Sequence, residues 1–210
     1  MQKIYLFSTT PHKDVVHVPS LSIKYLQPQI DFLQYNYFII TSKQTIAALQ
    51  KYENFDLLPA LCVSEKTALA YKEIGGKVLC TGDGYGKSLV AKIKEFSQET
   101  QWLYPRAKIV ASDFAQQARE NGFCIDEAIV YVSSCSQAIR DIKMEQDGVL
   151  IFTSPSSVKC FLQTHTILKG HKVIVIGHTT AHLLPEDVKP YISEINSVEH
   201  CVKIAKKMQE

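Results

Sequence analysis

An internal repeat constrains the fold of this 210-residue sequence more than any other feature. The segments FIITS, LCVSEKTA and SLVAKI are echoed, in the same order, by LIFTS, IVIGHTTA and SVEHCV. The first copies begin at residues 38, 61 and 88 and the second copies at residues 150, 174 and 197, so the separations are 112, 113 and 109 positions. Segments that recur in order at a nearly constant separation predict two similar halves within one chain.

Short apolar runs alternate with segments of helical periodicity. Runs rich in β-branched or aromatic residues are typical of strands covered on both faces, and they lie at residues 4–7, 37–40, 61–63, 108–110, 149–152 and 173–176. Apolar spacings of three and four predict helices, as at Phe114 and Ala118 before Gly122, and at Val198, Cys201, Val202, Ala205 and Met208. This alternation predicts βαβ units and an α/β fold with parallel sheets.

Hydroxyl-bearing residues recur where a predicted strand gives way to a helix. Ser42 and Thr67 in the first half correspond to Ser154 and Thr180 in the second. A hydroxyl at such a junction can cap the helix by accepting a backbone N–H bond. The junction can also bind an anion, and ligands of open α/β sheets bind beyond the carboxyl ends of the strands. Both interpretations stay open for one residue, but the recurrence favours two binding faces opposed across a cleft.

The glycine-rich segment at residues 81–88 (TGDGYGKS) precedes a predicted helix. A phosphate-binding loop would need glycine five positions before Gly86, where the sequence has Thr81. The glycine spacing does not fit a dinucleotide-binding fingerprint either. A flexible loop capped by Ser88 is therefore favoured over a nucleotide site.

Composition argues against several classes of protein. The formal net charge is +2 and the hydrophobic share is 46%, which is ordinary for a globular domain and gives no support for nucleic-acid binding. No apolar stretch approaches the roughly 18 residues that span a membrane. The apolar N-terminal run is too short for a signal peptide.

Cysteine and histidine offer no evident metal or catalytic motif. The six cysteines are scattered without a Cys-x-x-Cys pair, so we expect reduced cysteines in a cytosolic protein, most of them in the core, and no structural zinc. His178 and His182 lie four positions apart without a third ligand nearby. Neither a Ser-His-Asp order nor a Gly-x-Ser-x-Gly elbow is present.

The repeated segments carry a resemblance to a known family. Residues 39–46 (IITSKQTI) and 63–68 (VSEKTA), with their second copies at 151–158 (IFTSPSSV) and 176–181 (IGHTTA), resemble the uroporphyrinogen-III synthase family in order and spacing. The segment from Gly122 to Tyr131, which lies between the two copies, is similar to the family's G…V…VY segment. The sequence departs from the family pattern in three places, where arginine is missing from residues 8–11, Ser64 replaces glycine, and Ala107 replaces glycine.

The resemblance implies a particular arrangement of two lobes. Each lobe is expected to be a flavodoxin-like or Rossmann-like parallel sheet flanked by helices. One lobe would combine residues 1–27 with 140–210, and the other would be the continuous stretch 33–133. Residues 28–32 and 134–139 would form a two-stranded linker.

The resemblance also implies an activity. Members of this family close hydroxymethylbilane, a linear tetrapyrrole with eight carboxylates, into a ring with inversion of the last pyrrole and loss of water. This implies a cyclising hydro-lyase of heme biosynthesis that needs no cofactor and no metal. We expect a cytoplasmic monomer whose partner is the tetrapyrrole, with no nucleic-acid or membrane partner. The alternative is a non-enzymatic, cytosolic two-lobed protein that binds a small anion.

The resemblance finally suggests site residues. Tyr131 would hydrogen-bond the departing hydroxyl, since a phenol with a pKa near 10 stays protonated at neutral pH; the alternative is a strand tyrosine that packs its ring. The expected substrate-binding residues are Ser42, Thr67, Ser88, Ser154, Ser156, Thr179 and Thr180.

Overall fold

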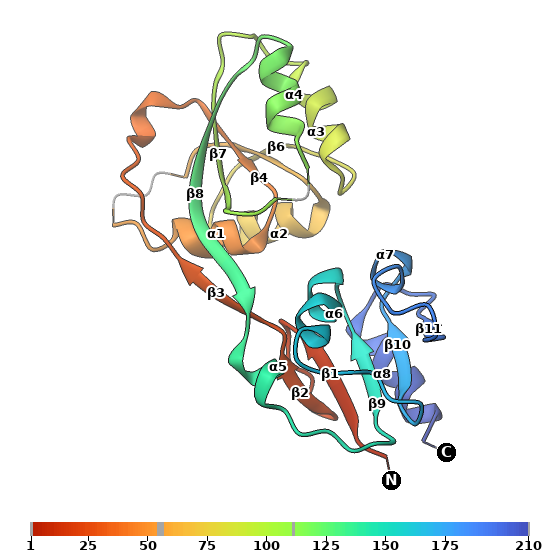
Figure 1. Ribbon diagram of the computed structural model, residues 1–210. Helices are drawn as coiled ribbons and strands as arrows, with labels where there is room; N and C mark the ends of the chain where they lie inside the picture. The colour runs from red at the N-terminus through yellow and green to blue at the C-terminus, as the bar shows by residue number, and fades with distance from the viewer. Residues whose placement is uncertain (1, 54–56, 111, 210) are drawn as a thin grey trace. The chain divides into compact units, whose positions relative to one another are not determined.

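The computed structural model describes residues 2–53, 57–110 and 112–209 (Figure 1). The chain divides into two compact units, the first comprising Met1–Ser22 with Ser134–Glu210 and the second Ile23–Ser133. The divisions fall inside two strands, β3 (Leu21–Tyr25) and β8 (Cys124–Cys135), which are neighbours in one sheet. Residues 28–32, expected in the linker, belong to the second unit.

The first unit contains a five-stranded sheet in the order β11-β10-β9-β1-β2, in which every pairing is parallel. Its strands are β1 (Ile4–Ser8), β2 (Val16–Pro19), β9 (Val149–Phe152), β10 (Lys172–Val175) and β11 (Tyr191–Ile192). Its helices are α5 (Gln137–Asp141), α6 (Pro155–Leu162), α7 (His178–Ala181) and α8 (Val198–Lys207).

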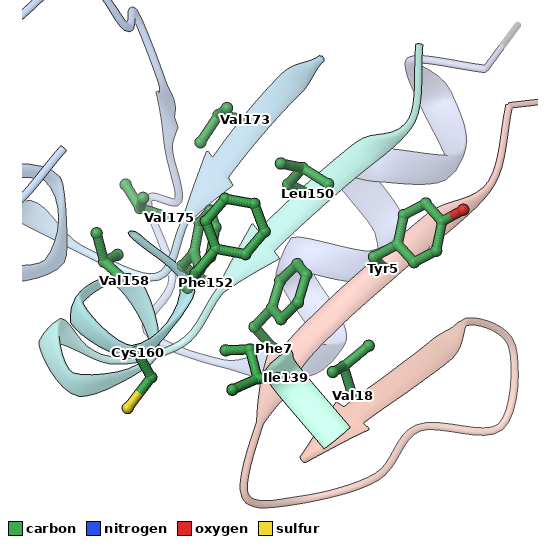
Figure 2. Close-up of a cluster of buried hydrophobic side chains, with 11 residues drawn as sticks. Tyr5, Phe7, Val18, Ile139, Leu150, Phe152, Val158, Cys160, Val173 and Val175 are labelled. Carbon is green, nitrogen blue, oxygen red and sulfur yellow. The ribbon is translucent and has the colours of Figure 1, made fainter. Parts of the chain in front are cut away.

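Alternate residues of these strands build two cores, one on each face of the sheet. Figure 2 shows the first, where Phe7, Leu150 and Phe152 meet Ile139 of α5 and Val158 of α6. The second core packs the intervening strand residues against α8, and it contains Ile4, Leu6, Val149, Ile151, Ile174, Cys201, Val202 and Ala205. Burial on both faces explains why these strands are almost continuously apolar. The apolar face predicted for the C-terminal helix is confirmed.

The second unit contains a six-stranded sheet in the order β3-β8-β7-β4-β5-β6. Besides β3 and β8, its strands are β4 (Tyr37–Ile40), β5 (Ala60–Cys62), β6 (Val78–Thr81) and β7 (Gln101–Ala107). Its helices are η1 (Phe32–Gln34), α1 (Lys43–Leu49), α2 (Glu65–Glu73), α3 (Gly86–Ile93) and α4 (Phe114–Glu120). Strands β4 to β8 pair in parallel.

Helices cover both faces of this sheet as well. Helices α1 and α2 pack on the face that carries Phe38 and Ile40, while α3 and α4 lie side by side on the face that carries Ile39 and Trp102 (Figure 1). The predicted α/β class with helix-flanked parallel sheets is therefore confirmed.

The two units repeat one plan. Strands β4 and β9 begin at residues 37 and 149, 112 positions apart, and helices α1 and α6 at residues 43 and 155, also 112 apart. Helices α2 and α7 begin at residues 65 and 178, 113 positions apart. The third repeat was misaligned by three residues, because α3 and α8 begin at residues 86 and 198 and are 112 positions apart. Strand β1 occupies beside β9 the place that β7 occupies beside β4.

The prediction of a strand at residues 108–110 is wrong. Strand β7 ends at Ala107, and Ile109 is 82% exposed in the loop that follows. Pro105 hid the true strand, because proline is rare inside sheets. It is tolerated here because β7 pairs with β4 only at Trp102 and Leu103, so the proline lies beyond that ladder.

The cysteines only partly follow the expectation. Cys62 and Cys201 are buried, as predicted for core residues. Cys135 and Cys160 form a disulfide with their Cα atoms 5.3 Å apart, so the expectation that all cysteines are reduced is wrong. Spacing along the chain could not reveal this pair, since β8 and α6 meet only in the folded first unit. Within the described ranges, no helix combines the length and apolar character required to cross a membrane.

Candidate functional site

A cavity of about 730 Å³ opens in the second unit where parallel strands end. Its wall includes the residues that directly follow β4 and β5, the last residue of β7, and the first turn of α3. This is the edge at which open α/β sheets bind ligands. The lining residues are Thr41, Ser42, Val63, Gly84, Tyr85, Gly86, Lys87, Leu89, Tyr104, Ala107, Ile109, Val110, Ser112, Asp113, Phe114, Gln117 and Tyr131.

Among the hydroxyl groups in the cavity wall, those of Thr41, Tyr104 and Tyr131 come from residues in a strand or directly after one. The hydroxyls of Thr41 and Tyr104 lie 3.3 Å apart and share a hydrogen bond. Burial raises the pKa of Tyr104, more than the Thr41 hydrogen bond and the Arg106 charge lower it, so this phenol stays neutral. Tyr131 is 7% exposed, and its hydroxyl forms no hydrogen bond with the described residues. The arrangement supplies hydroxyl donors to the cavity.

Ser42 lines the same cavity and also caps a helix. Its Oγ accepts a hydrogen bond from the backbone N–H of Gln44 at 3.1 Å, at the start of α1. The capping interpretation and the binding interpretation therefore apply to one side chain, because an oxygen that accepts one bond can still donate its own proton.

Thr67 and Ser88 do not line this cavity. The Thr67 hydroxyl is buried and lies 3.1 Å from that of Ser64, the residue that caps α2. Ser88 donates to the Tyr85 carbonyl at 2.8 Å and accepts from the Asp83 N–H at 3.1 Å, so it holds the glycine-rich loop in its turn. Both hydroxyls thus have partners inside the protein.

A charged cluster lies near Tyr104, which lines a second cavity together with Arg119 and Glu127. Glu127 of β8 forms ion pairs with Arg106 of β7 and, at 2.7 Å, with Arg119 of α4. Burial alone would raise the pKa of Glu127, but the hydrogen bond from Arg119 and the charge of Arg106 together lower it. Because the carboxylate is paired with both guanidinium groups, the cluster ties β7, β8 and α4 together.

The remaining predicted residues belong to the first unit, at the carboxyl ends of β9 and β10. Ser154 caps α6 in a reciprocal capping box with Ser157, while Ser156 is exposed. Thr179 is exposed in α7. Thr180 is 1% exposed, and its hydroxyl has no hydrogen-bond partner among the described residues.

The residues that sequence reasoning missed include Ser157, Thr41 and Tyr104. Ser157 gave no standard signal, because the signature of a capping box has Glu or Gln, and not serine, three positions after the capping residue. Thr41 directly precedes Ser42 and could have been included. Tyr104 could not be found, because the strand that carries it was not recognised.

The described residues contain no group of three or more His, Cys, Asp or Glu side chains that could hold a metal ion. His178 begins α7 and His182 caps its end.

Two doubly wound units, with hydroxyl-bearing residues where their strands end, define a two-unit α/β protein with a ligand cavity at a sheet edge. The chain belongs to the uroporphyrinogen-III synthase family, because the family model for uroporphyrinogen-III synthase HemD matches residues 13–203. The resemblance noted from the repeated segments is thereby confirmed, and an enzyme of this family is favoured over a non-enzymatic anion-binding protein.

Solved structures agree with this assignment. The uroporphyrinogen-III synthetase of Helicobacter pylori is 25% identical, with a TM-score of 0.84 over 99% of this chain and 100% of that one. A mutant uroporphyrinogen III synthase of the extremely thermophilic bacterium Thermus thermophilus is 18% identical, with a TM-score of 0.59 over 92% of this chain and 89% of that one, and shows the shared fold. No curated protein matches the sequence.

Proposed function

We propose that this enzyme is a cyclising lyase that converts hydroxymethylbilane into uroporphyrinogen III, with inversion of the last pyrrole ring and loss of water. The observation that carries the proposal is the cavity of about 730 Å³, with the hydroxyls of Thr41, Tyr104 and Tyr131 at the carboxyl edge of a parallel sheet. Its size falls in the range of small-molecule sites.

The main task of such an enzyme is conformational. Unassisted closure gives the uninverted isomer, so the site must hold a flexible chain in the geometry that leads to inversion. Eight carboxylates offer many points of attachment to hydroxyl and backbone N–H donors. We assign Ser42 and Thr180 to this role first, since Ser42 lines the cavity and the Thr180 hydroxyl has no hydrogen-bond partner among the described residues. Ser154, Ser156 and Thr179 belong to the same proposal at the strand ends of the first unit.

Thr67 and Ser88 were expected to bind substrate too. Their hydroxyls are engaged inside the second unit. We therefore give them a supporting role, in which they fix the start of α2 and the glycine-rich loop.

Tyr131 is proposed to assist the departing hydroxyl. Its phenol would give its proton to the hydroxyl oxygen while the carbon–oxygen bond breaks and water leaves. The lone pair of the terminal pyrrole nitrogen would replace the broken bond, and the N–H proton of that pyrrole would then return the phenolate to the phenol. The placement of Tyr131 in the wall of the cavity, with no competing partner among the described residues, supports this role. Acid assistance of this kind typically contributes about 10²–10⁴ in rate.

The proposal includes a cytoplasmic monomer that acts without a cofactor and has no nucleic-acid or membrane partner. The formal net charge of +2 supports the exclusion of nucleic acid. The oligomeric state can be measured by sedimentation of the purified chain.

The direct test is an assay with hydroxymethylbilane in which the products are oxidised and the two ring isomers are separated. The expected result is a product dominated by isomer III, against isomer I in the control without enzyme. A chain that binds hydroxymethylbilane but leaves isomer I as the product would contradict the proposal and restore the anion-binding alternative.

A further inference from the structure

The hydroxyl pair formed by Thr41 and Tyr104 lines the cavity, but no contact with the substrate has yet been assigned to it. Thr41 directly follows β4, and Tyr104 lies in the neighbouring strand β7. Their oxygens are 3.3 Å apart, and both residues line the cavity of about 730 Å³. Tyr104 is 3% exposed, with its ring packed against Phe114 at a centroid distance of 4.8 Å. The pair is therefore a fixed feature of the cavity wall.

The pair has one more O–H donor than its internal hydrogen bond uses. Each hydroxyl carries one O–H donor, and the mutual hydrogen bond uses one of the two. Neither oxygen has another hydrogen-bond partner among the described residues. Whichever residue donates within the pair, one O–H remains without an acceptor. A donor without an acceptor in a buried position is costly unless a ligand or water accepts from it.

Charged groups of both signs lie near the pair. Burial raises the pKa of the Tyr104 phenol, the Arg106 charge lowers it and the Glu127 charge raises it. Asp113 lines the same cavity wall. The only cationic side chain in the cavity wall among the described residues is Lys87, which is exposed at the start of α3. A carboxylate that reaches past Lys87 would meet a neutral donor at the sheet edge. Hydrogen bonds to ionised groups are about twice as strong as neutral ones.

We propose that the Thr41–Tyr104 pair is a substrate-binding element, in which Thr41 donates to the Tyr104 oxygen and Tyr104 donates to a carboxylate of the substrate. This assignment rests on the proposed function for the identity of the carboxylate, a propionate or acetate arm of the linear tetrapyrrole. The phenol takes the outer position because it is a stronger donor than an aliphatic alcohol. Thr41 acts as a positioning residue that fixes the direction of the phenolic O–H.

The test compares three variants in the assay with hydroxymethylbilane. Tyr104→Phe removes the donor and keeps the ring, so KM should rise about tenfold, which corresponds to the loss of one hydrogen bond to a charged group. Its kcat should stay within about twofold, since the bond is made in the bound substrate and the transition state alike. Thr41→Val should raise KM about two- to threefold, because the donor is retained but less well oriented. Thr41→Ser keeps the hydroxyl and should restore the wild-type KM.

A matched control is Tyr71→Phe. Tyr71 is also a buried phenol of the second unit, but its hydroxyl donates to the Leu58 carbonyl at 2.7 Å and it does not line the cavity. This variant should lower the melting temperature and leave KM and kcat unchanged. It therefore separates the loss of a buried hydroxyl from the loss of a substrate contact.

Three outcomes would overturn the assignment. A Tyr104→Phe enzyme with the wild-type KM would show that Tyr104 does not contact the substrate. A lower melting temperature with unchanged KM would leave Tyr104 as a structural residue, like Tyr71. A lower kcat with unchanged KM would move it from binding to chemistry. If the wild-type chain itself forms no isomer III, the proposed function fails and this inference falls with it, whereas a normal wild type with an unaffected variant contradicts only the inference.

Discussion

Equivalent threonines of the two units differ in whether their hydroxyl groups have a hydrogen-bond partner. Helices α2 and α7 both follow the strand next to the central one, and each carries a threonine three positions after its capping residue. In α2 the capping residue is Ser64, whose Oγ lies 3.1 Å from the Thr67 hydroxyl. In α7 the capping residue is Gly177, and the buried Thr180 hydroxyl has no partner among the described residues.

This difference separates hydroxyls that are engaged within the protein from hydroxyls that we propose to contact the substrate. A buried hydroxyl without a hydrogen bond costs about 1–3 kcal/mol, which a ligand can recover by accepting or donating the missing bond. The Thr67 hydroxyl already has a hydrogen-bond partner, which is the hydroxyl of Ser64. Equivalent positions in the repeat thus lead to different expectations. Free hydroxyls such as those of Thr180 and Tyr131 should affect turnover, and engaged hydroxyls such as that of Thr67 should affect stability.

The largest effect is expected for Tyr131→Phe, which removes a free hydroxyl and keeps the ring. The rate of isomer III formation should fall at least tenfold, because general acid assistance is typically worth about 10²–10⁴. The melting temperature should barely move, since no hydrogen bond within the described protein is lost. A near-normal rate would remove Tyr131 from the chemistry and leave an enzyme that works by shape and anion contacts.

Thr180→Val should produce the next largest effect. Substrate loses one hydroxyl contact, so kcat/KM should fall about tenfold, as for a hydrogen bond to a charged group. The free energy of unfolding should stay the same or rise slightly, because a buried hydroxyl without a partner is replaced by a methyl group. Steady-state kinetics and thermal unfolding of the same preparation measure both. An equal loss of stability and activity would favour a structural role instead.

Thr67→Val should reverse that pattern. The side chain is 5% exposed and bonded to Ser64, so its removal should cost about 1 kcal/mol of stability. The kinetic constants should stay within about twofold of the wild type, because the residue does not line the cavity. Urea unfolding with an unchanged slope gives the stability difference. A tenfold loss of kcat/KM at unchanged stability would place Thr67 among the substrate-binding residues after all.

The smallest effect concerns the loss of stability at acid pH, in which the ion pairs of the two units should also differ. The pKa of Glu127 lies below its ordinary value, so its ion pairs stabilise the folded state above about pH 4.3, the unfolded value, and this stabilisation is lost as pH falls through the folded pKa. Glu127→Gln should therefore lower stability at pH 7, and the gap to the wild type should close below about pH 4. In the first unit, Glu145 pairs with Lys3 at the surface.

Glu145→Gln is the matched control, and it should change stability little, since exposed pairs contribute little. A gap between wild type and Glu127→Gln that stays constant from pH 7 to pH 3 would show that packing, and not charge, holds the cluster of Glu127, Arg106 and Arg119.

The fold was more predictable than the site, for physical reasons. Strands such as 37–40 and 149–152 are buried on both faces and leave an unbroken apolar run, and the repeat located their counterparts. Strand β7 was missed because it contains Pro105. The apolar run around Ile109 resembles a strand, although Ile109 lies in an exposed loop. The contact between Thr41 and Tyr104 joins residues 63 positions apart and depends on that missed strand. Likewise, Thr67 and Thr180 look equivalent in the sequence, and only the hydrogen bonds of Ser64 distinguish them.

The most direct test of this account is the ratio of kcat/KM between Thr67→Val and Thr180→Val, measured side by side with hydroxymethylbilane. The two variants make the same chemical change at equivalent positions of the repeat. The account predicts that Thr67→Val retains near wild-type kcat/KM and that Thr180→Val loses about tenfold. Equal kinetic losses in the two variants would contradict the division into engaged and free hydroxyls.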